Sequence, residues 1–115
     1  MSRYEEIKKH PEEIKKLRIE LIEKYLELEN VRSEVKKVEK ETYVEVDNEV
    51  DEKNKKIFSN ETKRQVEVNE RISKSKTYTT LSTQLKNLEI EIKKIEVEVE
   101  YRKNMLKIIP LLDMD

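Results

Sequence analysis

The most regular pattern in the sequence is LSTQLKNLEIEIKKIEVEVEYRKNMLKII, which occupies residues 81–109. Apolar side chains recur in it at alternating intervals of four and three residues, interrupted only by Arg102. This spacing aligns one face of a helix and is typical of a coiled coil. The segment is therefore predicted to be a long helix that packs against another helix. The positions that share the face are Leu81, Leu85, Leu88, Ile92, Ile95, Val99, Arg102, Leu106 and Ile109.

A second apolar stripe runs along the same segment. A helix with two apolar stripes has more apolar surface than one antiparallel neighbour can bury. We therefore expect this helix to contact more than one other helix. The members of the second stripe are Ile90, Val97, Tyr101, Met105 and Ile108.

The N-terminal half carries a similar seam. A helix is predicted to begin at Pro11, because proline is favoured at the first helical position and acids such as Glu12 and Glu13 suit the positive end of the helix dipole. We expect this helix to cover residues 11–50, with a short lead-in helix before it as an option. Its seam consists of Ile14, Leu21, Leu28 and Val35 at seven-residue intervals and of Leu17, Val31 and Val38 offset by three; Ile22, Tyr25 and Leu26 lie off this seam.

The middle of the chain is predicted to reverse direction. Residues 41–52 contain six acids and no base, so like-charge repulsion disfavours a tight core there. The polar segment DEKNKKIFS follows, and Ser59 or Asn60 is a candidate N-cap for the next helix. We predict a turn over residues 51–60, a second helix over residues 60–109, and a short tail over residues 110–115 after the proline at position 110.

The second helix is not expected to be uniform. Val68 and Ile72 do not continue the register of the seam in residues 81–109. A change of register in a coiled coil indicates a local stutter. We place this stutter between Ser73 and Thr80.

Two arms of similar length predict an all-α fold, namely a long antiparallel coiled-coil hairpin that forms one domain over residues 1–115. Because each arm has surplus apolar surface, we expect the hairpins to assemble into an oligomeric helical bundle or to dock on helices of a partner. One unbroken helix that dimerises in parallel is the alternative. The residues expected to form the oligomer seam are Leu21, Leu28, Leu85, Leu88, Ile92, Ile95, Val99 and Leu106.

The composition argues against catalysis. The chain has 115 residues, with 25 basic and 26 acidic side chains, one His, and no Gly or Cys. An average composition would include about eight glycines, and without them Gly-rich phosphate loops are excluded. Thiolate nucleophiles, disulfides and two-His metal motifs are excluded as well. We therefore expect no enzyme activity, no metal, no cofactor and no small-molecule substrate.

Neither a membrane span nor a secretory signal is expected. No apolar run approaches the ~18 residues that cross a bilayer, and the N-terminal MSRYEEIKK lacks the apolar region of a signal peptide. We therefore expect a cytoplasmic protein with no membrane partner.

The charge distribution suggests one candidate binding segment. Residues 61–88 hold six basic and three acidic side chains, together with many hydroxyls. Amines, hydroxyls and an aromatic ring can hold a phosphate backbone and stack on a base. Single-stranded DNA is therefore a candidate partner. The candidate nucleic-acid-binding residues are Lys63, Arg64, Arg71, Lys74, Lys76 and Tyr78.

Three further features are interpreted from their position. His10 precedes the predicted helix start and is expected to be exposed. Arg102 occupies a seam position and is expected to pair with an acid across the seam, with a polar insertion that specifies the register as the alternative. The C-terminal IIPLLDMD is expected to fold back on the bundle or to fray, with a docking peptide as the alternative.

The segment KKIFSNETKRQVEV, residues 55–68, resembles small coiled-coil proteins of phages and mobile elements. In those proteins a Lys, an aromatic residue, Ser-Asn-Glu and a Lys-Arg pair open the second helix. A Gly-Lys-Pro turn is common there, whereas this chain has Asn54-Lys55-Lys56. The resemblance implies a role beside replication and recombination genes and no catalytic residues. The matching positions are Lys56, Phe58, Ser59, Asn60, Glu61, Lys63 and Arg64.

A second resemblance concerns chain length and element order. TYVEVDNEV and IEIKKIEVEVE alternate apolar and charged residues, which favours strands. Two helices separated by a small β element look like the β-type subunit of prefoldin. This resemblance implies a β element near Tyr43 to Phe58 and a chaperone function.

These observations lead to one main functional hypothesis. We expect a non-enzymatic, self-associating coiled-coil module that is an accessory factor in DNA recombination or replication and contacts single-stranded DNA or a DNA-processing protein. One alternative is a prefoldin-like holdase. Another is an inhibitor of a host defence protein, in which the acidic residues from Glu41 to Glu52 imitate nucleic acid.

Overall fold

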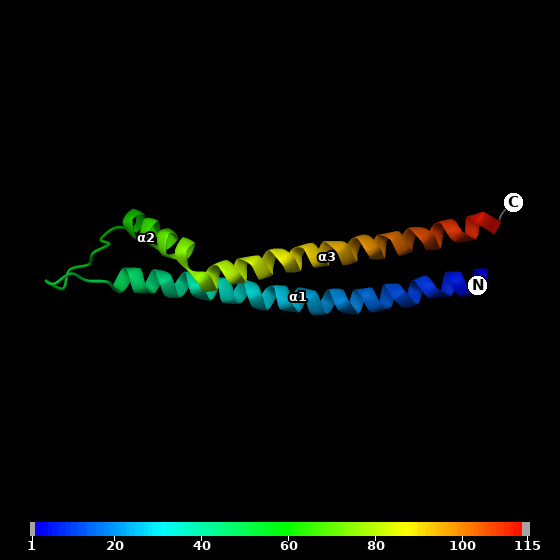
Figure 1. The fold of residues 1–115 in the computed structure, drawn as a ribbon, viewed down its shortest axis with the longest axis horizontal. Coiled ribbons are helices and arrows are strands. Elements are labelled where there is room, and N and C mark those ends of the chain that lie inside the picture. The colour runs from blue at the N-terminus through cyan, green and yellow to red at the C-terminus, as the bar shows by residue number, and fades with distance from the viewer. Residues whose placement is uncertain (1, 114–115) are drawn as a thin grey trace. The chain divides into compact units, whose positions relative to one another are not determined.

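The computed structural model describes residues 2–113, and these residues are largely helical (Figure 1). The elements are α1 (Arg3–Asn48), α2 (Glu61–Lys74), α3 (Lys76–Ile108) and a 3₁₀ helix, η1 (Ile109–Asp113). The prediction of an all-α chain with two helical arms is confirmed for these residues, and the alternative of one unbroken helix is wrong. The chain divides into two compact units, residues 1–28 with 87–115 and residues 29–86.

Helix α1 begins earlier than predicted. It starts at Arg3, so Pro11 lies inside the helix and does not open it. Ser2 provides the start, because its Oγ accepts a hydrogen bond from the Glu5 N–H at 3.2 Å and its carbonyl accepts one from the Glu6 N–H at 3.0 Å. Because proline has no backbone N–H, Pro11 removes one hydrogen-bond donor from the interior of the helix. The prediction that the helix begins at Pro11 is wrong.

In the first unit, α1 and α3 lie side by side and run in opposite directions (Figure 1). Ile14, Ile95 and Val99 form the core cluster, and Leu17, Leu21 and Leu106 pack against it. Full burial of such a side chain contributes about 1.5–3 kcal/mol. Among the predicted seam residues, Leu28, Leu88, Ile92, Ile95 and Val99 are buried and Leu21, Leu85 and Leu106 are half-buried. These residues are therefore buried or half-buried within a single chain.

In the second unit, α2 lies beside the C-terminal part of α1 (Figure 1). Val46 and Val68 are its most deeply buried side chains, at 0% and 3% exposure. Asn60 is the N-cap of α2, and its side chain accepts a hydrogen bond from the Lys63 N–H at 2.9 Å. Of the two candidate caps, Asn60 is therefore the one that caps the helix.

The reversal between α1 and α2 is a tight turn without glycine. Asn54 takes the left-handed conformation, with φ of 63°, which Asn tolerates better than most residues. Asp51 organises the turn, because its Oδ1 accepts hydrogen bonds from the N–H groups of Lys53 and Lys55, both at 2.9 Å. The backbone pairs Val50 with Lys56 in one antiparallel bridge, and the described residues contain no longer strand.

The predicted second helix is interrupted at Ser75. Its N–H donates to the Ile72 carbonyl at 3.0 Å and closes α2, while its Oγ accepts from the Tyr78 N–H at 3.2 Å and begins α3. Hydroxyl side chains compete with helical backbone hydrogen bonds, as at Ser73, whose Oγ donates to the Glu70 carbonyl. The predicted stutter between Ser73 and Thr80 is therefore a complete break, and the single helix predicted over residues 60–109 is wrong.

The C-terminal end is partly buried. Ile109 is fully buried in η1, whereas Leu111 and Leu112 are more than half exposed. The last two residues of the predicted tail, 114 and 115, lie outside the described residues. Over residues 2–113, none of the helices has a stretch long and apolar enough to cross a membrane.

Candidate functional site

The six predicted nucleic-acid-binding residues all lie in the second unit. Four of them are in α2, while Lys76 and Tyr78 are in the first turn of α3. Lys63 and Tyr78 line different depressions. The structure therefore does not gather the six side chains around one pocket.

Arg71 is held by two carboxylates. Its Nη2 donates to Glu49 Oε2 at 2.7 Å and its Nε donates to Glu67 Oε1 at 2.8 Å. These hydrogen bonds, with that of Glu49 foremost, raise the pKa of Arg71, and Arg71 in turn lowers the pKa of Glu49. The guanidinium also lies 5.9 Å from the centre of the Phe58 ring, within the range of a cation–π contact. Arg71 therefore connects α2 with both ends of the segment that joins α1 to α2.

Arg64 and Lys74 are also paired with acids. Arg64 contacts Glu61 at 3.2 Å and Asp47 at 3.7 Å, and it donates to the Phe58 carbonyl. Lys74 contacts Glu70 at 2.8 Å, which raises the pKa of Lys74. Three of the six predicted residues therefore have their charge balanced by a neighbouring acid. Asp47 lies at the end of α1 and Glu49 just after it, and nothing in the spacing of residues 61–88 could have indicated these contacts.

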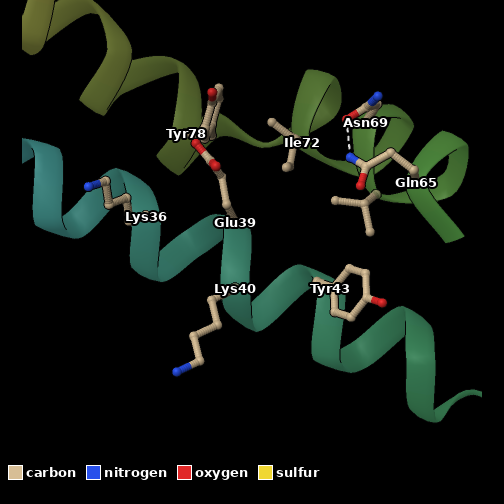
Figure 2. Close-up of a pocket in the computed structure, with 9 residues that line it drawn as sticks. Lys36, Glu39, Lys40, Tyr43, Gln65, Asn69, Ile72 and Tyr78 are labelled. Carbon is tan, nitrogen blue, oxygen red and sulfur yellow. Dashed lines mark hydrogen bonds between the residues drawn. The ribbon is translucent and has the colours of Figure 1, made fainter. Parts of the chain in front are cut away.

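A cleft lies between α1, α2 and the start of α3 (Figure 2). Its volume is about 450 Å³. Figure 2 shows Glu39 extending from α1 toward Tyr78, while the amine of Lys40 points away from α2. The lining residues are Lys36, Glu39, Lys40 and Tyr43 of α1, Gln65, Val68, Asn69 and Ile72 of α2, and Tyr78 of α3.

The cleft is lined by both apolar and polar side chains. Val68 is a buried lining residue, and Gln65 donates a hydrogen bond to Asn69 at 3.1 Å on the α2 side. Across residues 2–113, no cluster of three or more His, Cys, Asp or Glu side chains is placed to hold a metal ion.

The first unit exposes apolar side chains on the outer sides of both helices. Those of α1, which we call the α1 outer stripe, are Ile19, Ile22 and Leu26, exposed by 48%, 62% and 57%. Those of α3, the α3 outer stripe, are Ile90, Val97, Tyr101 and Ile108, exposed by 45–70%. Successive residues are rotated by about 100° around a helix axis. By this measure the α1 outer stripe lies about 140° around α1 from the buried seam, and the α3 outer stripe lies about 170° around α3 from it.

A shallow apolar groove adjoins the α1 outer stripe. Its volume is about 550 Å³, and its apolar lining residues are Pro11, Ile14, Ile19, Ile22 and Leu106. Lys15, Arg18 and Lys103 also line it. The apolar surface of α1 thus extends from the seam to the outer stripe.

A polar contact crosses the seam near the chain ends. His10 is only 7% exposed, and its Nδ1 lies 3.4 Å from Nη1 of Arg102. The prediction of an exposed His10 is wrong, because α1 begins before this residue and His10 lies four residues before Ile14 on the seam face. That interval was visible in the sequence. Arg102 pairs with an acid, but Glu98 lies on its own helix at 3.0 Å, so the prediction of an acid across the seam is wrong.

Comparison of the chain with models of protein families, with curated proteins and with solved structures finds no match. The resemblances to phage coiled-coil proteins and to prefoldin stay predictions. The functional argument therefore uses the geometry of the outer stripes, the cleft and the ion pairs.

Proposed function

We propose that this chain is a non-enzymatic helical interaction protein that associates with copies of itself through the outer stripes. The observation that carries the proposal is the position of these stripes, on the sides of α1 and α3 that face away from the hairpin seam. The chain's own seam therefore leaves them uncovered.

Burial of the outer stripes provides the driving force for association. Their side chains are exposed by 45–70%, so covering each one removes about half of its apolar surface from water. At about 25 cal/mol per Å², that is worth on the order of 1 kcal/mol per side chain. Part of this gain offsets the entropy lost on association. Contiguous apolar surface of this kind is characteristic of protein–protein contacts.

Sedimentation velocity across a range of concentrations tests the proposal. The wild-type chain should exceed the mass of a single 13.9 kDa copy. The double substitution Ile22→Gln/Val97→Gln places one amide in each outer stripe and should shift the protein toward the monomer. Glu34→Gln/Glu41→Gln is the matched control at exposed positions of the second unit, outside the stripes, and should leave the mass unchanged. A wild-type chain that is monomeric at every concentration refutes the proposal.

Nucleic-acid binding is not part of this proposal. Arg64, Arg71 and Lys74 are paired with acids, which reduces the positive charge available to phosphates. Binding to phosphate depends on such charge and weakens with salt. The single-stranded DNA prediction stays open to titration with an oligonucleotide at low and moderate salt.

The other functional predictions also stay open. The accessory role in DNA recombination or replication depends on the resemblance of residues 55–68 alone. The prefoldin-like holdase requires a β element, and residues 43–58 contain one bridge. The inhibitor hypothesis requires a free acidic surface, whereas Asp47 and Glu49 each contact an arginine.

A further inference from the structure

The α1 outer stripe is flanked by charges of opposite sign at its two ends. Lys16 and Arg18 are exposed at its N-terminal end, and Glu27 and Glu29 are exposed at its C-terminal end. On the helix surface, Arg18 and Glu29 lie on one flank of the stripe and Lys16 and Glu27 on the other, by the ~100° rotation per residue. The stripe is therefore basic at one end and acidic at the other on both flanks.

This arrangement is complementary to itself in one orientation only. When two helices pack antiparallel, residues on the same flank face each other, so Arg18 meets Glu29 of the second copy and Lys16 meets Glu27. When two helices pack parallel in register, opposite flanks meet, so Arg18 faces Lys16 and Glu29 faces Glu27. Like charges at such positions oppose association. The charges therefore select the antiparallel arrangement.

The apolar side chains fit the same pairing. The twofold axis that relates Arg18 to Glu29 and Lys16 to Glu27 passes close to Ile22. It places Leu26 of the second copy opposite Ile19, at the groove of about 550 Å³ that Ile19 and Ile22 line. Charge and shape thus agree on one register.

We propose that the α1 outer stripe is the contact between two copies of this chain, packed antiparallel about a twofold axis near Ile22. This inference rests on the proposed function and specifies its interface. The α3 outer stripe is a poorer candidate, because an antiparallel pairing centred between Val97 and Tyr101 would bring Glu98 close to Glu98 of the second copy on one flank and Glu100 close to Glu100 on the other.

The position of the stripe also determines the form of the dimer. In a closed four-helix bundle, each helix faces its two neighbours in directions about 90° apart. The α1 outer stripe lies about 140° from the seam around α1. The second copy therefore packs on the side of α1 that faces away from α3. The dimer is therefore a layer with the two α1 helices in its centre.

Charge reversal tests this interface in the full chain. Lys16→Glu/Arg18→Glu makes both ends of the stripe acidic, and Glu27→Lys/Glu29→Lys makes both ends basic. Each variant alone should weaken self-association by about tenfold or more, because its charge pairs become repulsive. An equimolar mixture of the two variants should recover association, because every facing pair is again opposite in sign.

Controls separate this interface from self-association in general. Lys93→Glu/Lys107→Glu changes the same number of charges on α3 and should associate as the wild type does. Circular dichroism establishes that each variant keeps its helix content. Glu23 lies close to its own counterpart across the axis, so Glu23→Gln should tighten association.

The outcomes distinguish this inference from the proposed function. A monomeric wild type refutes both. A wild type that associates, with charge-reversal variants that associate equally well, refutes this interface and leaves self-association standing. Weakened variants whose mixture does not recover refute the antiparallel register, whereas recovery in the mixture supports it.

Discussion

Replacing both members of the His10–Arg102 contact by leucine should stabilise the hairpin. Both side chains lie on the seam, at 7% exposure for the whole of His10 and 18% for the side chain of Arg102. Their contact, at 3.4 Å between Nη1 and Nδ1, is long for a hydrogen bond. Two leucines at these positions would continue the 4,3 apolar spacing of both helices.

The expected gain in free energy of unfolding follows from comparing buried leucines with the polar contacts that they replace. Burying a leucine contributes about 1.5–3 kcal/mol. Loss of the Arg102–Glu98 pair costs about 0.2–0.5 kcal/mol, and loss of the long hydrogen bond costs about 1 kcal/mol or less. The variant His10→Leu/Arg102→Leu should therefore gain about 2 kcal/mol in free energy of unfolding. Arg102→Leu alone should gain less free energy of unfolding, because the buried His10 ring then loses its contact with the Arg102 guanidinium.

Urea unfolding followed by circular dichroism measures this gain. Because association adds to apparent stability, the wild type, both single variants and the double variant are compared at matched concentrations. The double-mutant cycle isolates the coupling between the two positions. A double variant no more stable than the wild type would show that the polar contact contributes as much as buried leucines and would refute the reasoning.

The remaining predictions concern the second unit. Asn54→Val should destabilise the chain by about 1–2 kcal/mol, because a β-branched residue resists the φ of 63°. Urea unfolding would measure this loss of stability, and a variant as stable as the wild type would show that the turn adopts another conformation. Asn60→Ala should cost about 1 kcal/mol through loss of the α2 cap, with faster amide exchange at Lys63 as the local readout, and unchanged exchange would contradict the cap. Arg71→Gln should raise the pKa of Glu49 toward its ordinary value of 4.5, since the Arg71 hydrogen bond lowers it. In the wild type, the stabilisation from this pair is present above about pH 4.5 and is lost as the pH falls through the lowered pKa of folded Glu49. A carboxyl NMR titration of both proteins measures the shift, and identical curves would contradict the pairing.

Local errors in the prediction have identifiable causes. Proline is favoured at the first helical position, which predicts a helix start at Pro11. In the structure, Ser2 caps a helix that begins earlier and includes Pro11. The same error explains the wrong prediction for His10, because His10 occupies a seam position once the helix is extended toward the N-terminus. At Ser75 the register change was visible, but whether a helix bends or breaks there depends on which side chains cap the two ends.

The candidate binding residues show a different limit. Net charge over residues 61–88 counts only the side chains within that segment. The acids that neutralise Arg64 and Arg71 include Asp47 and Glu49, which approach only because the chain reverses through the turn at Asn54. Pairing across that turn depends on the relative rotation of α1 and α2, which apolar spacing does not specify.

The sequence by itself determined that the chain is helical, that residues 81–109 form an apolar seam, and that each arm has apolar side chains in excess of that seam. These properties follow from periodicity, which is a local consequence of 3.6 residues per turn. Only the tertiary structure decided which apolar stripe is buried, which cations are neutralised and where the uncovered surface lies. The reason is that burial and ion pairing are properties of two helices together, set by the turn that joins them and by their rotation against each other.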